Sequence, residues 1–217
     1  IEAALQKSNS NVTGGYLVKI DRLDPGDAGF TAGGQALAYV DPKEREIRLP
    51  QRDPQEQYLK KYFNDFNAAL TNANWLDPEL GYRPFIDVDA WIDFHIVEEL
   101  SGSVDAFRQS TFFHKPRNGK LVFGPHWDYD RAFGSPGGGM VARSWLSGGF
   151  TGGWDARLFK DKDFWQAWID RFQELRESHL ALTNVFRLID GFADEVRQAQ
   201  PRETAKWHVS LRGGTFQ

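Results

Sequence analysis

The sequence predicts an α+β fold in which a small antiparallel sheet precedes a helix-rich region that holds a β-hairpin. Three observations lead to this prediction. Before residue 50, apolar residues fall in short runs rich in β-branched and aromatic side chains, as in strands. After residue 53, apolar residues recur at intervals of three and four, as in amphipathic helices. Asn118 and Gly119, between two aromatic runs, form a strong hairpin-turn signal.

The first part of the chain is expected to supply strands. Residues 15–21, 35–40 and 46–49 are short apolar runs, and the last two are expected to pair across the turn at residues 41–43. The stretch 24–34 is rich in Gly, Pro and Asp, and we expect a loop there.

Two long helices follow. The first is expected to begin at Asp53 as N-cap, with Pro54 and Glu56 as further start signals, and its apolar stripe runs from residue 59 to 70. The second is capped by Asp87 and ends at Gly102. It is apolar nearly all round, so we expect it to be central and buried.

The predicted hairpin, with strands at 108–115 and 121–124, is framed by acidic residues. Asp105 lies between the buried helix and the first strand, and Asp128 and Asp130 follow the second strand. A hairpin brings its two ends together, so Asp105 is expected to approach the acidic pair.

Asp128 and Asp130 are candidate metal ligands. Side chains two residues apart in an extended segment point the same way, so both can face one cation while Trp127 and Tyr129 face the protein. Mg²⁺ takes carboxylate oxygens, often one or two from the protein. The alternative for an isolated Asp-Tyr-Asp sequence is a solvated turn whose carboxylates cap backbone amides.

Asp105 is a candidate general base, because a rigid element positions it just past a helix. The alternative is an ordinary turn residue at a helix end. Glu98 and Glu99 end the same helix. Either one of them supports the site, or both are solvated at the helix end, and the sequence favours neither alternative. His126 is expected to be a hydrogen-bonded strand residue rather than a ligand.

The C-terminal third is predicted to hold two glycine-rich loops and two amphipathic helices. The loops, residues 134–139 and 147–153, lack the context of a phosphate loop and are expected to be mobile and to cover or flank the acidic site. The helices carry apolar stripes at residues 164–175 and 188–196, and the second should stop before Pro201.

Composition excludes several classes of function. The net charge of -4 gives no basic stripe for nucleic acid. The absence of Cys excludes disulfides, thiolate metal sites and a cysteine nucleophile. No apolar run approaches the ~20 residues that span a bilayer. No histidine has a partner at metal-ligand spacing, so a zinc site is not expected.

Six segments in order carry a family resemblance: residues 85–94, 98–102, 104–106, 110–113, 119–121 and 124–134, the last reading Gly-Pro-His-Trp-Asp-Tyr-Asp-Arg-Ala-Phe-Gly. Together with residues 14–21 and the Leu49-Pro50 stretch, they make the chain resemble the spore coat protein H (CotH) kinase family. The resemblance covers roughly residues 14–176.

The resemblance implies a protein-kinase-like fold, mainly its helix-rich catalytic lobe, and transfer of the ATP γ-phosphoryl group to a Ser or Thr of a protein. Asp105 would orient and deprotonate the acceptor hydroxyl, and Asp128 and Asp130 would hold Mg²⁺, Mn²⁺ or Ca²⁺. Protein kinases and many relatives have a metal-binding Asn five residues after the catalytic Asp. Here that position is Ser110, a neutral and weaker ligand. Gln109 beside it and Arg131 are the candidate nucleotide contacts.

The resemblance also bears on the extent and location of the protein. The family's nucleotide-gripping Lys would precede Ile1, and neither Lys19 nor Lys43 follows a glycine-rich strand pair. We therefore expect the 217 residues to form a single domain that holds the catalytic half, and a longer product to be the active form. An extracytoplasmic, cell-surface or spore-coat location is expected.

Two other functions remain open from the sequence. One is a non-catalytic kinase-like scaffold that binds protein or a cell-surface polymer, with a site that has decayed at Ser110. The other is a metal-dependent hydrolase, because an acidic metal site alone does not choose between water and a hydroxyl as acceptor.

Overall fold

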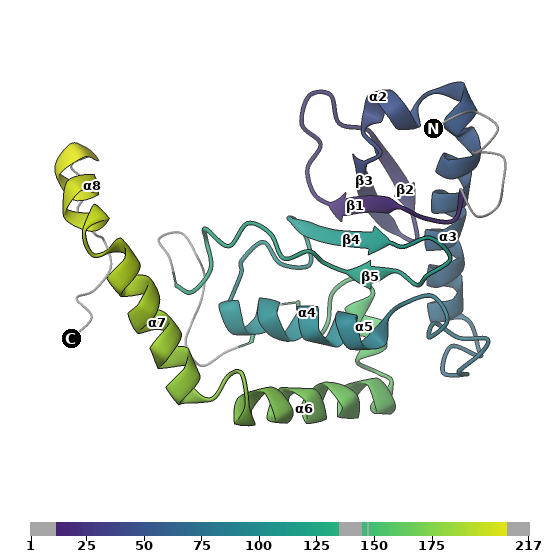
Figure 1. Ribbon diagram of the computed structural model, residues 1–217. Helices are drawn as coiled ribbons and strands as arrows, with labels where there is room; N and C mark the ends of the chain where they lie inside the picture. Colours follow the sequence, from purple (N-terminus) through teal and green to yellow (C-terminus); the bar gives the residue numbers. More distant parts are fainter. Residues whose placement is uncertain (1–11, 135–144, 147, 208–217) are drawn as a thin grey trace.

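The computed structural model describes residues 12–134, 145–146 and 148–207, and it confirms the predicted α+β class (Figure 1). The expected helical start near residues 2–7, the frayed end at 211–217 and most of the first glycine-rich stretch lie outside the described residues. The strands are β1 (Tyr16–Ile20), β2 (Gly29–Ala32), β3 (Gln35–Asp41), β4 (Thr111–Lys115) and β5 (Val122–Phe123). The helices are α2 (Glu44–Ile47), η2 (Pro50–Arg52), α3 (Asp53–Thr71), α4 (Val88–Ser101), α5 (Asp155–Leu158), α6 (Lys162–Glu177), α7 (Leu182–Val196) and α8 (Ala199–Trp207).

One five-stranded antiparallel sheet has the order β2-β3-β1-β4-β5. The strands expected at 15–21 and 35–40 are confirmed as β1 and β3. The stretch 24–34 is not only a loop, because β2 lies in it and packs the Phe30 ring 4.6 Å from that of Tyr39. The strand expected at residues 46–49 is wrong. That segment forms the short helix α2, which buries Ile47 completely.

The predicted hairpin is present, with shorter strands. Phe113 pairs with Phe123 and His114 with Val122. The first strand begins at Thr111 rather than residue 108, because residues 104–108 form a turn closed by a 2.8 Å bond from the Gln109 amide to the Asp105 carbonyl. All five residues of β4 also pair with β1, so the hairpin is joined to the central strand of the sheet, with β5 at the edge.

The long helices follow their predicted apolar stripes. Leu59, Phe63, Phe66 and Leu70 of α3 are buried. Asp53 is not the N-cap, because η2 runs directly into α3 and Asp53 already has helical backbone angles. The caps of α4 are confirmed. The Asp87 carboxylate accepts a bond from the Ala90 amide, and Gly102 ends the helix in the left-handed region at φ 60°.

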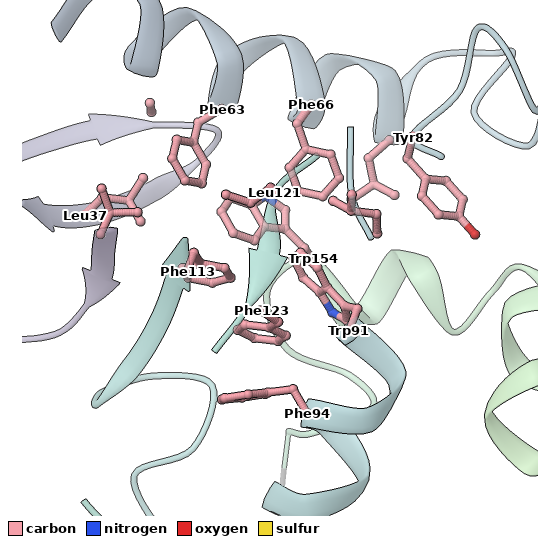
Figure 2. Packing of buried hydrophobic residues seen from close by; sticks show 14 of the residues in the cluster. Leu37, Phe63, Phe66, Tyr82, Trp91, Phe94, Phe113, Leu121, Phe123 and Trp154 are labelled. Carbon is pink, nitrogen blue, oxygen red and sulfur yellow. The ribbon is translucent and has the colours of Figure 1, made fainter. Parts of the chain in front are cut away.

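The core is an aromatic layer that α3, α4 and the sheet enclose, with α6 against the far side of α4 (Figures 1 and 2). Phe113 and Phe123 of the hairpin stack at 4.5 Å, and Phe123 stacks at 4.1 Å on Phe94 of α4. Trp91 lies 4.4 Å from Phe123 and is fully buried. This packing fixes the hairpin against α4, whose C-terminal end leads directly to Asp105.

The C-terminal helices differ from one another in burial. In α6, Phe164 and Trp168 are buried, as expected from its stripe. In α7, no residue is buried, and the helix extends away from the rest of the fold (Figure 1). It ends at Val196, before Pro201 as predicted, but Pro201 then lies in the first turn of an unpredicted helix, α8. None of the described helices is long and apolar enough to cross a membrane.

Candidate functional site

Asp105 lies in the turn that leads from α4 to the hairpin. Its side chain is 14% exposed and is flanked by two arginines. Arg108 Nη2 is 3.4 Å from Asp105 Oδ1, and Arg131 Nη1 is 3.3 Å from Asp105 Oδ2. Arg131 directly follows Asp130, so Asp105 contacts the residue next to the acidic pair.

Asp128 contacts Ser110, which follows the same turn on its hairpin side. The Ser110 hydroxyl donates to Asp128 Oδ2 over 3.2 Å. Two hard oxygen donors therefore lie side by side, on residues that the sequence analysis assigned to metal binding. Asp130 and Gln109 are exposed, and within the described part of the chain neither side chain has a hydrogen bond or ion pair.

The donor set suits Mg²⁺ better than a cation that needs a complete protein cage. Among the described residues, no three His, Cys, Asp or Glu side chains gather as a metal cage. Mg²⁺ keeps several waters and is usually held by one or two carboxylates together with substrate phosphates. A carboxylate and a hydroxyl at an exposed position fit that mode.

Backbone conformations with positive φ concentrate around this site. Phe107 (65°), Ser110 (49°), Asp128 (65°) and Phe133 (52°) all have left-handed φ, and among described non-glycine residues only Asn118 in the hairpin turn shares it. Such conformations cost energy and persist where the surroundings impose them, often at functional sites. They also replace the extended chain that the sequence analysis assumed after β5, so the alternation of sides from 127 to 130 does not hold.

Trp127 therefore does not face the protein as expected, and 61% of it is exposed. Its ring lies 5.8 Å from that of Phe112 and forms one wall of a pocket of about 480 Å³. The pocket also reaches Lys19 of β1 and Val40 of β3. It therefore lies on the face of the sheet that carries Lys19, and the residue that precedes Asp128 in the chain forms part of its wall.

Tyr129 does face the protein, and the residues that it meets were not identified from the sequence. Its hydroxyl donates to Glu98 Oε1 in the last turn of α4 and lies 2.7 Å from His126 Nδ1. Burial raises the pKa of Tyr129, and the bond to Glu98 raises it further, so the hydroxyl stays protonated. His126 is hydrogen-bonded as expected, but it lies outside any strand and stacks on Phe94 at 4.7 Å.

Glu99, which follows Glu98 in α4, contacts a different segment, the one that contains Leu146. Its Oε2 accepts a 2.7 Å bond from the Leu146 amide, and burial raises its pKa to about 7. Nearby, His95 Nε2 lies 2.9 Å from the Gly149 carbonyl, and burial lowers the pKa of His95 to about 4. The described part of the second glycine-rich stretch is thus packed against α4. The expectation that this stretch is mobile is wrong, because these buried partners hold it. A Cβ added at Gly149 would lie 3.3 Å from the Phe107 ring, so the stretch flanks the turn that contains Asp105, which is one of the two expected positions.

Comparison with known proteins decides the family. The family model described as CotH kinase protein matches residues 1–217, beyond the 14–176 over which the resemblance was recognised. The chain belongs to the CotH kinase family. No curated protein and no solved structure matches it. Membership of the CotH kinase family supports a kinase-like function and implies ATP and a divalent metal in general terms.

Ser110→Asn tests the metal role of position 110. Asn adopts positive φ more readily than most residues, so the backbone at 49° should accept it without refolding. We expect Mg²⁺ affinity or turnover to rise, because an amide oxygen replaces a hydroxyl at the position where protein kinases carry a metal-binding Asn. Calorimetric titration of Mg²⁺ with ATP measures the affinity, and initial rates of phosphoryl transfer measure the turnover. A fall in both quantities, with folding intact, would show that the bond from Ser110 to Asp128 has a specific role of its own.

Proposed function

We propose that this CotH-family chain transfers the γ-phosphoryl group of ATP to a Ser or Thr of a protein, with a divalent cation. One observation carries the proposal: two contacts join the turn of the candidate base to the acidic segment. Ser110 bonds Asp128 at one end, and Asp105 pairs with Arg131 at the other. The candidate base and the candidate metal carboxylate are thereby held on neighbouring segments, as phosphoryl transfer needs.

Each residue has a definite task in this proposal. Asp105 orients the acceptor hydroxyl and takes its proton, while the hydroxyl oxygen forms a bond to the γ-phosphorus and the bond to ADP breaks. Asp128, with Ser110 and Asp130, holds the cation. When bound, the cation neutralises charge on the phosphates. Arg131 moves from Asp105 to a phosphate oxygen as substrate enters, which frees the carboxylate for the hydroxyl.

The pocket beside Trp127 is the proposed site of the nucleotide base. Its size is within the usual range of small-molecule sites, and its walls include the rings of Trp127 and Phe112. Lys19 Nζ, 3.2 Å from Asp21 Oδ2, lies on the same face. We expect the base to stack on the exposed Trp127 ring, with its phosphates towards Asp128, the next residue in the chain.

Trp127→Ala should weaken ATP binding by about tenfold, because stacking of a base on an aromatic ring contributes ~1–3 kcal/mol. Fluorescence or calorimetric titration with ATP and Mg²⁺ measures the change. Phe133→Ala is the matched control: Phe133 is 74% exposed, is near the same segment and is not part of the pocket wall. Equal losses of ATP affinity in both variants would show that the pocket does not bind the nucleotide base.

Titration of ATP with Mg²⁺, with and without EDTA, distinguishes the proposed kinase from a non-catalytic scaffold. We expect ATP binding to require Mg²⁺ and EDTA to abolish it. A non-catalytic scaffold has no need of metal-dependent nucleotide binding. Nucleotide binding that is unchanged by EDTA, or no nucleotide binding at all, would favour the scaffold.

A further inference from the structure

The acidic segment is tied to the end of α4 at two points that the proposed chemistry does not use. The first is the bond from the Tyr129 hydroxyl to Glu98 Oε1. The second is a 2.6 Å bond from the Phe133 amide to the carbonyl of Ser101, the last residue of α4. Tyr129 lies between the two acidic residues in sequence, so fixing its side chain constrains the backbone on both sides of it.

Glu98 is placed for this task by the buried face of α4. It is only 4% exposed, although a carboxylate at a helix end is usually solvated. A buried carboxylate needs hydrogen-bond partners, and Glu98 finds them in Tyr129 and in His126, whose Nδ1 is 3.4 Å from Glu98 Oε1. The Tyr129 hydroxyl has a single proton, which goes to Glu98. The His126 Nδ1 atom therefore carries the proton that it shares with the Tyr129 oxygen.

The neighbouring carboxylate has a different partner. Glu99 faces the other way, towards the Leu146 amide. The same helix turn leads through Gly102 to Asp105. The end of α4 is therefore the shared support of the candidate base and of the acidic segment.

We propose that Glu98 is the positioning residue of the metal-binding segment, acting through the Tyr129 hydroxyl to hold Asp128 and Asp130 in the arrangement that binds the cation. The metal part of this inference rests on the proposed function. Residues that orient metal ligands from outside typically change affinity or activity by about 10–100-fold when removed. Without the bond from Tyr129 to Glu98, fewer contacts hold the left-handed backbone at Asp128, and the carboxylate is less firmly placed beside Ser110.

The test compares Tyr129→Phe, Glu98→Leu, the double variant and Glu98→Gln. Titration of Mg²⁺ with a non-hydrolysable ATP analogue should show about tenfold weaker binding in each of the first two variants. The double variant should be no weaker than either, because both remove the same contact. Glu98→Gln keeps an oxygen acceptor for the Tyr129 hydroxyl and should restore most of the affinity. In transfer assays the loss should appear in kcat, with the KM for the acceptor protein unchanged.

Glu99→Leu is the matched control, because it makes the same change as Glu98→Leu at the adjacent buried residue, which faces Leu146. It should leave the affinity for the Mg²⁺ complex unchanged. Hydrogen exchange gives a readout that needs no metal: amides of residues 126–133, above all that of Phe133, should exchange faster in Tyr129→Phe and Glu98→Leu than in the parent chain.

The outcomes separate the two proposals. If the parent chain binds no Mg²⁺ with ATP, the proposed function fails, and the exchange rates still decide whether Glu98 orders the segment. If exchange of residues 126–133 is the same in the parent, Tyr129→Phe and Glu98→Leu chains, Glu98 does not position the segment. A Glu99→Leu variant that loses as much affinity as Glu98→Leu would also overturn the inference.

Discussion

Asp105→Asn is expected to lower phosphoryl transfer by about 100-fold or more while nucleotide and Mg²⁺ binding persist. Asn has the same shape as Asp but cannot take the proton of the acceptor hydroxyl. The change also removes two ion pairs, those with Arg108 and Arg131, at 3.4 and 3.3 Å. Both arginines are exposed, and such pairs contribute little to stability, so the fold should be unaffected.

Initial rates of transfer from labelled ATP to a Ser-containing acceptor, with thermal unfolding of each variant, check this prediction. Asp194→Asn is the control, because Asp194 pairs with Arg197 at the exposed end of α7, which extends away from the rest of the fold (Figure 1). It should leave the rate unchanged. If Asp105→Asn transfers at the parent rate, Asp105 is a structural turn residue, and the alternative for this position is correct.

Asp128→Asn is expected to lower Mg²⁺ affinity, and with it ATP affinity, by about 100-fold or more, since losing an outer partner of a metal ligand already costs 10–100-fold. A neutral amide is a poorer ligand than a carboxylate for a hard dication. The structure favours this variant over Asp128→Ala, because Asp128 has φ 65°. Ala there would add about 1–2 kcal/mol of backbone strain, whereas Asn tolerates the left-handed region.

Calorimetric titration of Mg²⁺ with ATP measures the effect, and Asp130→Asn provides the comparison. Asp130 is exposed and has no bond to Ser110, so its loss should weaken binding less than the loss of Asp128. If Mg²⁺ binding is unchanged in Asp128→Asn and abolished in Asp130→Asn, the metal ligand is Asp130 and not Asp128.

The parts of the fold that could be predicted are those set by local chemistry. The caps of α4 follow from Asp87 and Gly102, and the hairpin follows from its turn residues and aromatic strands. The strand expected at 46–49 failed because a few apolar residues fit a short helix as well as a strand. β2 was missed because its glycine-rich surroundings resemble a loop, while packing of Phe30 on Tyr39 decides its structure.

The candidate site could be proposed from the sequence, but its geometry could not. The acidic residues around the hairpin were identifiable, and the structure brings Ser110 to Asp128 and Arg131 to Asp105. Their orientation was not predictable, because it depends on positive-φ residues that break the alternation of an extended chain. The role of Glu98 needed the tertiary structure, since the partner that buries it lies 31 positions away.

The most direct test of the central claim is the fate of the γ-phosphoryl group of labelled ATP. It should be followed in the parent chain and in its Asp105→Asn and Asp128→Asn variants. We predict that label appears on Ser or Thr of an acceptor protein, that its transfer requires Mg²⁺, and that both variants lose it. Label that appears only as inorganic phosphate would indicate a hydrolase. Label transfer that survives both substitutions, or ATP that is never consumed, would contradict the assignment of this site to phosphoryl transfer.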